Sequence, residues 1–380
     1  MKPDSKAILT AIFVGIIGAE SFLVQPGLVG GLVDHRGLTP GEAGFVASAD
    51  MFGMAVASFV ISLIITRISW RTLLWPSAMA IMLGNALCFY LTDPTALFAV
   101  RLIAGAGYGG FVSLSFATMG RSATPEKTFG VYITLCLVYG ALGLYLMPAM
   151  LAWNGIEAVL WFFILFPLVA LPFLRFFPHG GEAEGASAAH KGYRVGAMIW
   201  GAALAAIFAY FLAQGAVWAY LDRIGVAGGL RVADVGSALA LCSIAGIFGA
   251  TAATVQKGRF GRLWPLLCGI SLSVGSLAFL VGRQDYLPYV LACSVFNFAW
   301  NYIHPFLLSI MADLDDTGRF MIWTAGLQTL GLAVGPMIAA LFITPTNFEM
   351  VNLFAGTLFV VSLLLMLRAA YATGREARLA

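Results

Sequence analysis

The segment PHGGEAEGASAAHKGYR, residues 178–194, is the longest polar stretch between the apolar runs of this 380-residue chain. It is rich in Gly and Ala, a composition typical of a flexible linker. Six long apolar runs precede it and six follow it. The segment therefore predicts an N-terminal six-helix bundle (1–177), a cytoplasmic linker (178–194) and a C-terminal six-helix bundle (195–380).

The composition is that of a multi-pass membrane protein. Hydrophobic residues make up 61% of the chain, charged residues only 10%, and the mean hydropathy is +0.91, far from the values of soluble globular proteins. A helix needs about 20 apolar residues to cross a bilayer core of roughly 30 Å. The runs predict an all-α membrane protein with twelve transmembrane helices, at about 7–33, 40–66, 72–91, 95–119, 128–152, 156–177, 195–221, 232–255, 263–282, 287–312, 319–343 and 348–369.

The basic residues are distributed unevenly between the two sides of the membrane. If the N-terminus is cytoplasmic, sixteen of the 21 Lys and Arg residues fall in cytoplasmic segments, four fall outside, and Arg101 lies within a span. The positive-inside rule then predicts that both termini are cytoplasmic, in a cell (inner) membrane. The first apolar run continues too far for a signal peptide, so we expect a retained first helix.

The two halves of the sequence resemble each other. VDHRG (33–37) ends the first span and LDRIG (221–225) ends the seventh. An offset of 188 or 189 residues separates several pairs, namely Asp34 and Asp222, Gln25 and Gln214, and Pro148 and Pro336. The constant offset predicts a duplicated six-helix unit with both copies in the same orientation.

Twelve helices in two parallel repeats resemble the major facilitator superfamily of secondary transporters. Helix four of many members has the motif R-x-x-x-G-x-G, which RLIAGAGYGG (101–110) reproduces with Arg101, Gly105 and Gly107. The family's glycine-rich basic loop between helices two and three is kept in the second half by KGRFGRLWP (257–265) and lost in TRISWRTLLWP (66–76). The retained loop positions are Gly258, Arg259, Gly261 and Arg262.

The helix-five signature of the family's proton antiporters is incomplete. GALGLYLMP (140–148) keeps Pro148 but not the Gly-Pro pair, which GLAVGPMIAA (331–340) has as Gly335 and Pro336. The resemblance implies a proton- or gradient-driven carrier whose two halves rock around a central cavity near the bilayer midplane.

Three charged residues lie well inside the predicted spans, namely Glu20, Asp50 and Arg101. A charge at the bilayer centre costs at least about 2.5 kcal/mol, so these residues are candidates for proton coupling. The resemblance places helices one and four at the cavity, which implies a Glu20–Arg101 pair. A conformational change that separates or joins that pair would make Glu20 bind or release a proton. The alternatives are a static ion pair, and a hydrated Asp50 near the membrane surface.

Uncharged polar residues supply candidates for substrate binding. Asn297, Asn301 and His304 in NFAWNYIHP (297–305) share one helix face by their i, i+4, i+7 spacing. Repeat-matched Gln25 and Gln214 would face each other across the pseudo-two-fold axis. Two weaker candidates are Gln328 and Asn85. Hydrogen bonding between helices would explain the same residues equally well.

Several functions are disfavoured by what the sequence lacks. The five cysteines lie in apolar runs without a C-x-x-C pair, and a lone histidine makes no metal site. We therefore expect no cofactor and no metal. A formal net charge of +3 gives no indication of a nucleic-acid partner. There is no nucleophile elbow or phosphate loop, so we expect no enzyme.

These observations favour a secondary active transporter of a small organic solute, with proton antiport as the first hypothesis. The first alternative is a proton symporter or uniporter of an organic anion, with Arg101 binding the substrate carboxylate as a planar bidentate fork. A remote alternative is a membrane receptor that binds without transporting. The expected partners are the solute, protons and the lipid bilayer, and we expect a monomer.

Overall fold

The computed structural model describes residues 4–179, 197–256, 263–314, 319–344 and 347–376. Apart from one isolated bridge between Thr344 and Asn347, the regular structure in these ranges is helical. Contacts divide the chain into two compact units, Met1–Glu184 and Gly185–Ala380. Most of the predicted linker (178–194) lies outside the described residues, so the bundle boundaries stay a prediction.

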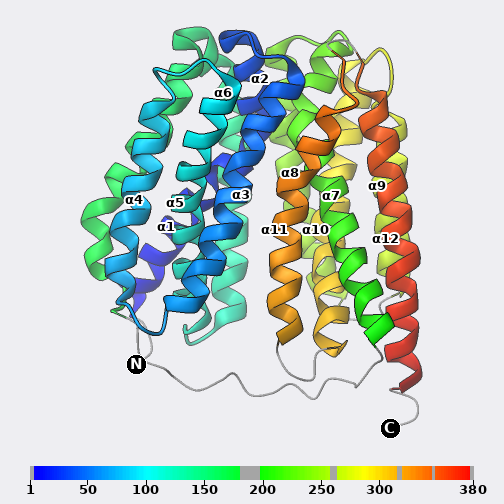
Figure 1. Ribbon diagram of the computed structural model, residues 1–380. Coiled ribbons are helices and arrows are strands. Elements are labelled where there is room, and N and C mark those ends of the chain that lie inside the picture. Colours follow the sequence, from blue (N-terminus) through cyan, green and yellow to red (C-terminus); the bar gives the residue numbers. More distant parts are fainter. Residues whose placement is uncertain (1–3, 180–196, 257–262, 315–318, 345–346, 377–380) are drawn as a thin grey trace. The chain divides into compact units, whose positions relative to one another are not determined.

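The first unit is built from long helices that run nearly parallel (Figure 1). They are α1 (Ser5–Leu23), α2 (Gln25–Arg36), α3 (Pro40–Ile64), α4 (Trp70–Leu87), α5 (Pro94–Gly120), α6 (Pro125–Ala170) and the 3-10 helix η1 (Leu171–Phe176). Helix α5 lies at the centre of this packing, against α1, α3 and α4.

The predicted first span is broken into α1 and α2. The break lies at Val24, whose φ of −110° and ψ of 14° are not helical. Pro26 occupies the first turn of α2, where its missing N–H is tolerated and its ring disfavours a continuous helix. The chain therefore changes direction between Glu20 and Gln25, which are both candidate site residues.

The predicted fifth and sixth spans are the two arms of α6. The helix is interrupted at Asn154 and at Gly155, whose φ of 60° lies in the left-handed region that favours glycine. The sequence prediction ends one span at residue 152 and begins the next at residue 156, so it brackets this interruption.

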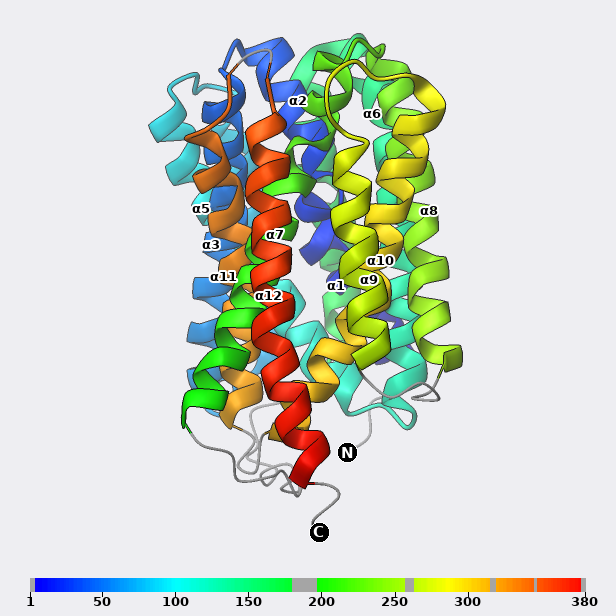
Figure 2. The same ribbon diagram turned by 90° about the vertical axis from the view of Figure 1, so that its right-hand side faces the viewer.

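The second unit contains six helices among its described residues (Figure 2). Helix α10 packs against α8 and α9, while α7 packs against α11 and α12. Their bounds are α7 (Ala197–Ala227), α8 (Val232–Gln256), α9 (Leu263–Ala278), α10 (Tyr286–Leu314), α11 (Arg319–Ala340) and α12 (Glu349–Glu376).

Helix α7 corrects the predicted end of the seventh span. The prediction stops at residue 221, but the helix continues to Ala227 and takes in Asp222 and Arg223. Both side chains are buried, and Arg223 Nη2 lies 2.6 Å from Asp222 Oδ2. Because the two charges lie in one ion pair, they do not end the helix as a polar loop would.

Seven helical segments among the described residues are long and apolar enough to cross a membrane by length and composition alone. They are Ser5–Leu23, Pro40–Ile64, Pro94–Gly120, Lys127–Phe176, Met198–Ala227, Val232–Gln256 and Glu349–Ala369. The segment Lys127–Phe176 is 50 residues long and includes the interruption in α6, so it corresponds to two predicted spans.

Helices α3 and α5 touch backbone to backbone. A Cβ atom at Gly53 would lie 2.2 Å from the carbonyl oxygen of Leu102, and one at Gly105 would lie 2.3 Å from that of Asp50. Small residues permit such close approach of membrane helices. The crossing fixes Asp50 on α3 opposite Arg101 on α5.

Candidate functional site

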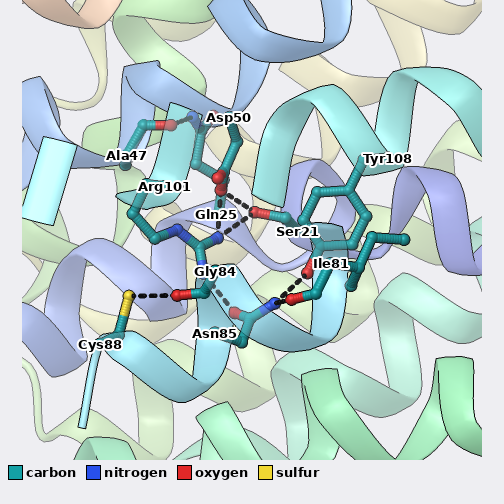
Figure 3. A network of polar contacts seen from close by, with 10 residues as sticks. All are labelled: Ser21, Gln25, Ala47, Asp50, Ile81, Gly84, Asn85, Cys88, Arg101 and Tyr108. Atoms are coloured by element: carbon teal, nitrogen blue, oxygen red, sulfur yellow. Dashed lines mark hydrogen bonds and ion pairs between the residues drawn. The ribbon is translucent and has the colours of Figure 1, made fainter. Parts of the chain in front are cut away.

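A buried ion pair lies where α1, α3 and α5 meet. Arg101 Nη2 and Asp50 Oδ2 are in direct contact, and the two side chains are only 3% and 1% exposed. Ser21 joins them, because its hydroxyl donates to Asp50 Oδ2 and its oxygen accepts from Arg101 Nη2 at 2.9 Å (Figure 3). A charge-assisted network of this kind is expected where charges are buried.

Asn85 on α4 holds the other side of the guanidinium. Arg101 Nη1 donates to Asn85 Oδ1 at 2.6 Å. The Asn85 amide nitrogen donates to the carbonyl oxygen of Ile81 at 2.8 Å and to the hydroxyl of Tyr108 at 3.1 Å (Figure 3). The ring of Phe163 lies 5.6 Å from the guanidinium carbon, within the range of a cation–π contact.

The predicted Glu20–Arg101 pair is wrong, because Arg101 is paired with Asp50 instead. Glu20 is fully buried, and its Oε2 accepts from the hydroxyl of Tyr139 on α6 at 3.2 Å. Consecutive helix residues point about 100° apart, so when Ser21 faces Arg101, Glu20 faces α6. The alternative of a hydrated Asp50 near the surface is also wrong, since Asp50 is 1% exposed.

Four buried oxygen atoms of the first unit have no hydrogen-bond partner within the described residues, namely Glu20 Oε1, Asp50 Oδ1, Gln25 Oε1 and Ser115 Oγ. The orientation of the Gln25 amide is set by its nitrogen, which donates to the carbonyl oxygen of Ala47 at 3.4 Å. Buried polar atoms are usually satisfied, so these oxygens are candidates for binding a proton or a donor group of a ligand.

In the second unit the predicted polar residues contact one another, and none of them is an acidic or basic residue of the Asp, Glu, Lys or Arg type. Asn297 on α10 donates to the carbonyl oxygen of Cys242 on α8 at 2.9 Å, and Asn301 donates to Asn297 Oδ1 at 3.1 Å. His304 Nε2 lies 3.3 Å from the amide nitrogen of Gln328 on α11. These four side chains therefore belong to two hydrogen-bonded pairs.

Gln214 on α7 is fully buried. Its amide nitrogen donates to the Tyr210 hydroxyl at 2.9 Å, while its Oε1 has no partner among the described residues. The ring of the adjacent Phe211 packs edge-on against His304, with centroids 5.2 Å apart. Gln214 and His304 thus lie on neighbouring parts of one unit, with aromatic rings beside both.

The predicted motif residues that the structure describes lie inside helices, and the glycines among them pack against neighbouring helices. Gly107 packs on the backbone of Ser77, and Gly335 on that of Leu212. Pro148 and Pro336 lie inside α6 and α11, and the Pro336 carbonyl accepts from the Tyr220 hydroxyl at 3.1 Å. The four loop positions Gly258, Arg259, Gly261 and Arg262 lie outside the described residues.

Several ion pairs among the described residues are not predicted from the sequence, including an exposed one between Arg231 and Asp234. Besides Asp222–Arg223, Arg36 Nη2 at the end of α2 lies 3.0 Å from Glu157 on α6, and Arg36 Nη1 donates to the carbonyl oxygen of Leu91 at 3.0 Å. A charge near a span end is hard to tell from a loop charge in sequence. In the described part of the chain, no group of three His, Cys, Asp or Glu residues is placed to hold a metal ion.

Comparison with known proteins agrees with the helical fold described above. The model of the Major Facilitator Superfamily matches residues 10–326. The match covers well over half of the chain, so the chain belongs to the Major Facilitator Superfamily and is a membrane transporter with its twelve-helix fold.

Two transporters with described functions are similar to this chain in sequence. The putative niacin/nicotinamide transporter NiaP of Bacillus subtilis is 22% identical over 370 residues, which cover 90% of this chain and 88% of that protein. The niacin transporter NiaP of Acinetobacter baylyi is 28% identical over 141 residues, which cover 37% of this chain and 31% of that protein.

Solved structures share the fold at low identity. The D-xylose-proton symporter has a TM-score of 0.73 at 15% identity, covering 95% of this chain and 96% of that one. The human organic anion transporter MFSD10 (TETRAN) has a TM-score of 0.66 at 18% identity, covering 96% and 100%. At these identities the likeness concerns the fold alone.

Proposed function

We propose that this chain is a secondary transporter that exchanges a small organic solute for protons by alternating access. The observation that carries the proposal is the buried group of Glu20, Asp50 and Arg101 in the first unit. Two carboxylates and one guanidinium leave this group one positive charge short of neutrality. A proton supplies that charge and avoids a bare carboxylate in the membrane.

We assign the transported proton to Glu20. Asp50 already has Arg101 as its counter-charge. Glu20 accepts from the Tyr139 hydroxyl on one oxygen, and its other oxygen has no hydrogen-bond partner within the described residues. A solute that donates a hydrogen bond to this free oxygen would compete with the proton. Competition between solute and proton for one site is the requirement for antiport.

The solute we propose is an aromatic carboxylic acid or amide of the size of niacin or nicotinamide. The names of the two relatives support this class, and one of them matches over 90% of this chain. The candidate contacts are the uncharged polar side chains Gln25, Gln214, Asn297, Asn301, His304 and Gln328. Amide groups and an imidazole suit the ring nitrogen and the carbonyl oxygen of such a solute.

A second candidate function is proton symport of an organic anion. The Arg101 Nε atom has no partner among the described residues, and a protonated Asp50 would release Nη2 as well. A substrate carboxylate would then find a planar donor fork. In this case the proton and the anion would enter together rather than in exchange.

The proposal includes a placement in the membrane. The excess of basic residues on one side supports cytoplasmic termini in a cell (inner) membrane. We propose a monomer of two six-helix halves, 1–177 and 195–380, joined by residues 178–194. It would transport without a cofactor or metal and without catalysing a reaction.

Transport into vesicles tests the proposal. Purified protein is reconstituted, and entry of labelled nicotinamide and niacin is followed under pH gradients of either sign. We expect gradient-driven transport, with Glu20→Gln lowering it at least about tenfold, because the proton site is lost. The sign of the effective gradient separates antiport from symport.

Glu349→Gln is the matched control, because Glu349 is exposed at the start of α12 and should leave transport unchanged. Equal proton dependence in wild type and Glu20→Gln would refute the coupling role. Binding of either compound without movement across the membrane would instead identify a receptor.

A further inference from the structure

An apolar groove lies between α9 and α12 of the second unit, where the two helices pack beside each other (Figure 2). Its volume is about 660 Å³, and aliphatic side chains such as Leu277, Leu353 and Val360 line most of it. Leu353 and Val360 are exposed, and the α12 segment that carries them is apolar enough to cross a membrane. In a bilayer such side chains contact lipid chains, so the groove is open to lipid.

One end of the groove is polar. Glu349, the first residue of α12, lines the groove and also a second hollow of about 260 Å³, whose wall includes Gly282 and Asn347. Among the described residues, no cation lies within ion-pair distance of the Glu349 carboxylate. The lining positions on α12 extend from Glu349 to Val361, roughly 18 Å of helix rise. A long apolar groove that ends at a carboxylate has the layout of a site for a lipid chain and its headgroup.

Asn352 supplies a second acceptor at this end. Its side chain lines the groove, is only 5% exposed, and donates through its amide nitrogen to the carbonyl oxygen of Leu280 at 2.7 Å. This hydrogen bond sets the orientation of the amide, because a carbonyl oxygen only accepts. The other amide atom, Asn352 Oδ1, has no hydrogen-bond partner within the described residues. Since buried acceptors are usually satisfied, Oδ1 is a candidate for a hydrogen bond from a ligand.

We propose that this groove binds a phospholipid whose headgroup is a primary ammonium, as in phosphatidylethanolamine. The acyl chain lies along α9 and α12, and the ammonium group lies at the polar end with Glu349 and Asn352. A primary ammonium has three N–H donors and a positive charge, so it pairs with the carboxylate and also donates to Asn352 Oδ1. A choline headgroup has the same charge but no N–H donor. The two acceptors therefore favour ethanolamine over choline.

Native mass spectrometry of the full chain in detergent tests the headgroup. The probes are phosphatidylethanolamine and phosphatidylcholine with identical acyl chains. We expect the wild type to bind the ethanolamine lipid at least about tenfold more tightly, the size expected for one hydrogen bond to a charged group. Asn352→Leu should abolish this preference, while Glu349→Gln should weaken binding of both lipids, because both are cationic at the headgroup nitrogen.

Gly356→Leu tests the chain part of the groove. Gly356 lines the groove, and a Cβ atom there would meet nothing within 4 Å, so a leucine side chain takes the place of the acyl chain without a clash. Leucine also favours a helix over glycine. We expect binding of both lipids to fall at least about tenfold. Gly275→Leu on α9 is the matched control, because Gly275 has the same open space and does not line the groove.

Asp285→Asn is the matched control for Glu349→Gln, because Asp285 is exposed and lines neither hollow. If Asn352→Leu fails to fold, Glu349→Gln and Gly356→Leu carry the test. The groove shares no residue with the solute contacts proposed above, so Glu349→Gln should keep wild-type transport while its lipid affinity falls.

Equal wild-type affinities for the two lipids would overturn the headgroup assignment, and unchanged lipid binding in Gly356→Leu would overturn the site. A wild-type dimer that Gly356→Leu converts to a monomer, without bound lipid in either, would overturn the proposal by identifying a second copy of the chain as the occupant. None of these results bears on proton coupling, which the transport assay tests separately.

Discussion

In each unit two helices meet at a close glycine contact, but the polar side chains beside the contact differ between the units. In the first unit Gly53 on α3 packs on the backbone of Leu102 on α5, and in the second Gly249 on α8 packs on the backbone of Phe298 on α10. Gly249 and Phe298 each follow their counterparts by 196 residues. The same step leads from Arg101 to Asn297.

The position that carries a buried cation in one unit therefore carries an amide in the other. Arg101 requires Asp50, Ser21 and Asn85 as partners, whereas Asn297 donates to a single backbone carbonyl, that of Cys242. The comparison teaches that two units can keep the same helix contact and still place a charge at a position that is uncharged in the other unit. Under the proposed function, proton coupling would belong to the first unit and recognition by uncharged side chains to the second.

The largest expected effect on stability comes from breaking the ion pair. Asp50→Asn keeps the shape but leaves Arg101 buried without a counter-charge, which should lower the free energy of unfolding by about 3–5 kcal/mol. Thermal or denaturant unfolding in detergent measures this. The double variant Asp50→Asn/Arg101→Gln should recover much of the loss, and a single variant as stable as wild type would show that the pair is dispensable.

The helix crossing should give the next largest effect. Gly105→Ala forces a methyl group against the backbone of Asp50 and should cost about 1–3 kcal/mol in unfolding. Gly130→Ala on α6 is the matched control, because nothing lies within 4 Å of its added Cβ, and it should be neutral or slightly stabilising.

The second unit offers the same pair of substitutions. A Cβ atom at Gly335 would lie 2.4 Å from the carbonyl oxygen of Leu212, while Gly326 has open space. Equal costs for Gly105→Ala and Gly335→Ala would sharpen the view that the two units share their packing. Equal stability of all four alanine variants would contradict the close crossings.

The smallest effect is expected at the uncharged counterpart of Arg101. Asn297→Leu removes the hydrogen bond to the Cys242 carbonyl and the one accepted from Asn301, whose amide keeps the backbone carbonyl of residue 297 as a partner. The change should cost only about 1 kcal/mol, because all the groups involved are uncharged. Its transport should keep the wild-type dependence on pH, in contrast to Glu20→Gln, which serves as the comparison in the same assay. A shifted midpoint in Asn297→Leu would place proton coupling in both units.

Much of the fold could be predicted from the sequence because membrane spans are long and apolar. The interruption at Asn154 and Gly155 falls where the prediction separates two spans. The end of α7 could not be predicted, since Asp222 and Arg223 look like loop charges until their pairing is known. Pairing depends on rotamers and burial, which a hydropathy pattern does not contain.

The candidate site was predictable in its charged members and not in their pairing. Glu20, Asp50 and Arg101 are conspicuous because charges inside spans are costly. Which acid meets Arg101 depends on the rotation of α1 about its axis, and the sequence does not determine that angle. The sequence gives only a weak signal for Asn85 and none for Ser21, because uncharged polar residues are common in membrane helices and contribute little on average.

The backbone contact between α3 and α5 has a practical consequence for distance measurements. Two helices that meet at Gly53 and Gly105 without intervening side chains cannot slide past one another without steric clash. Exposed positions such as Val56 on α3 and Ile103 on α5 accept spectroscopic labels without disturbing that contact. The distance between such labels should therefore stay constant, and it provides a reference for measuring larger distance changes elsewhere in the transporter.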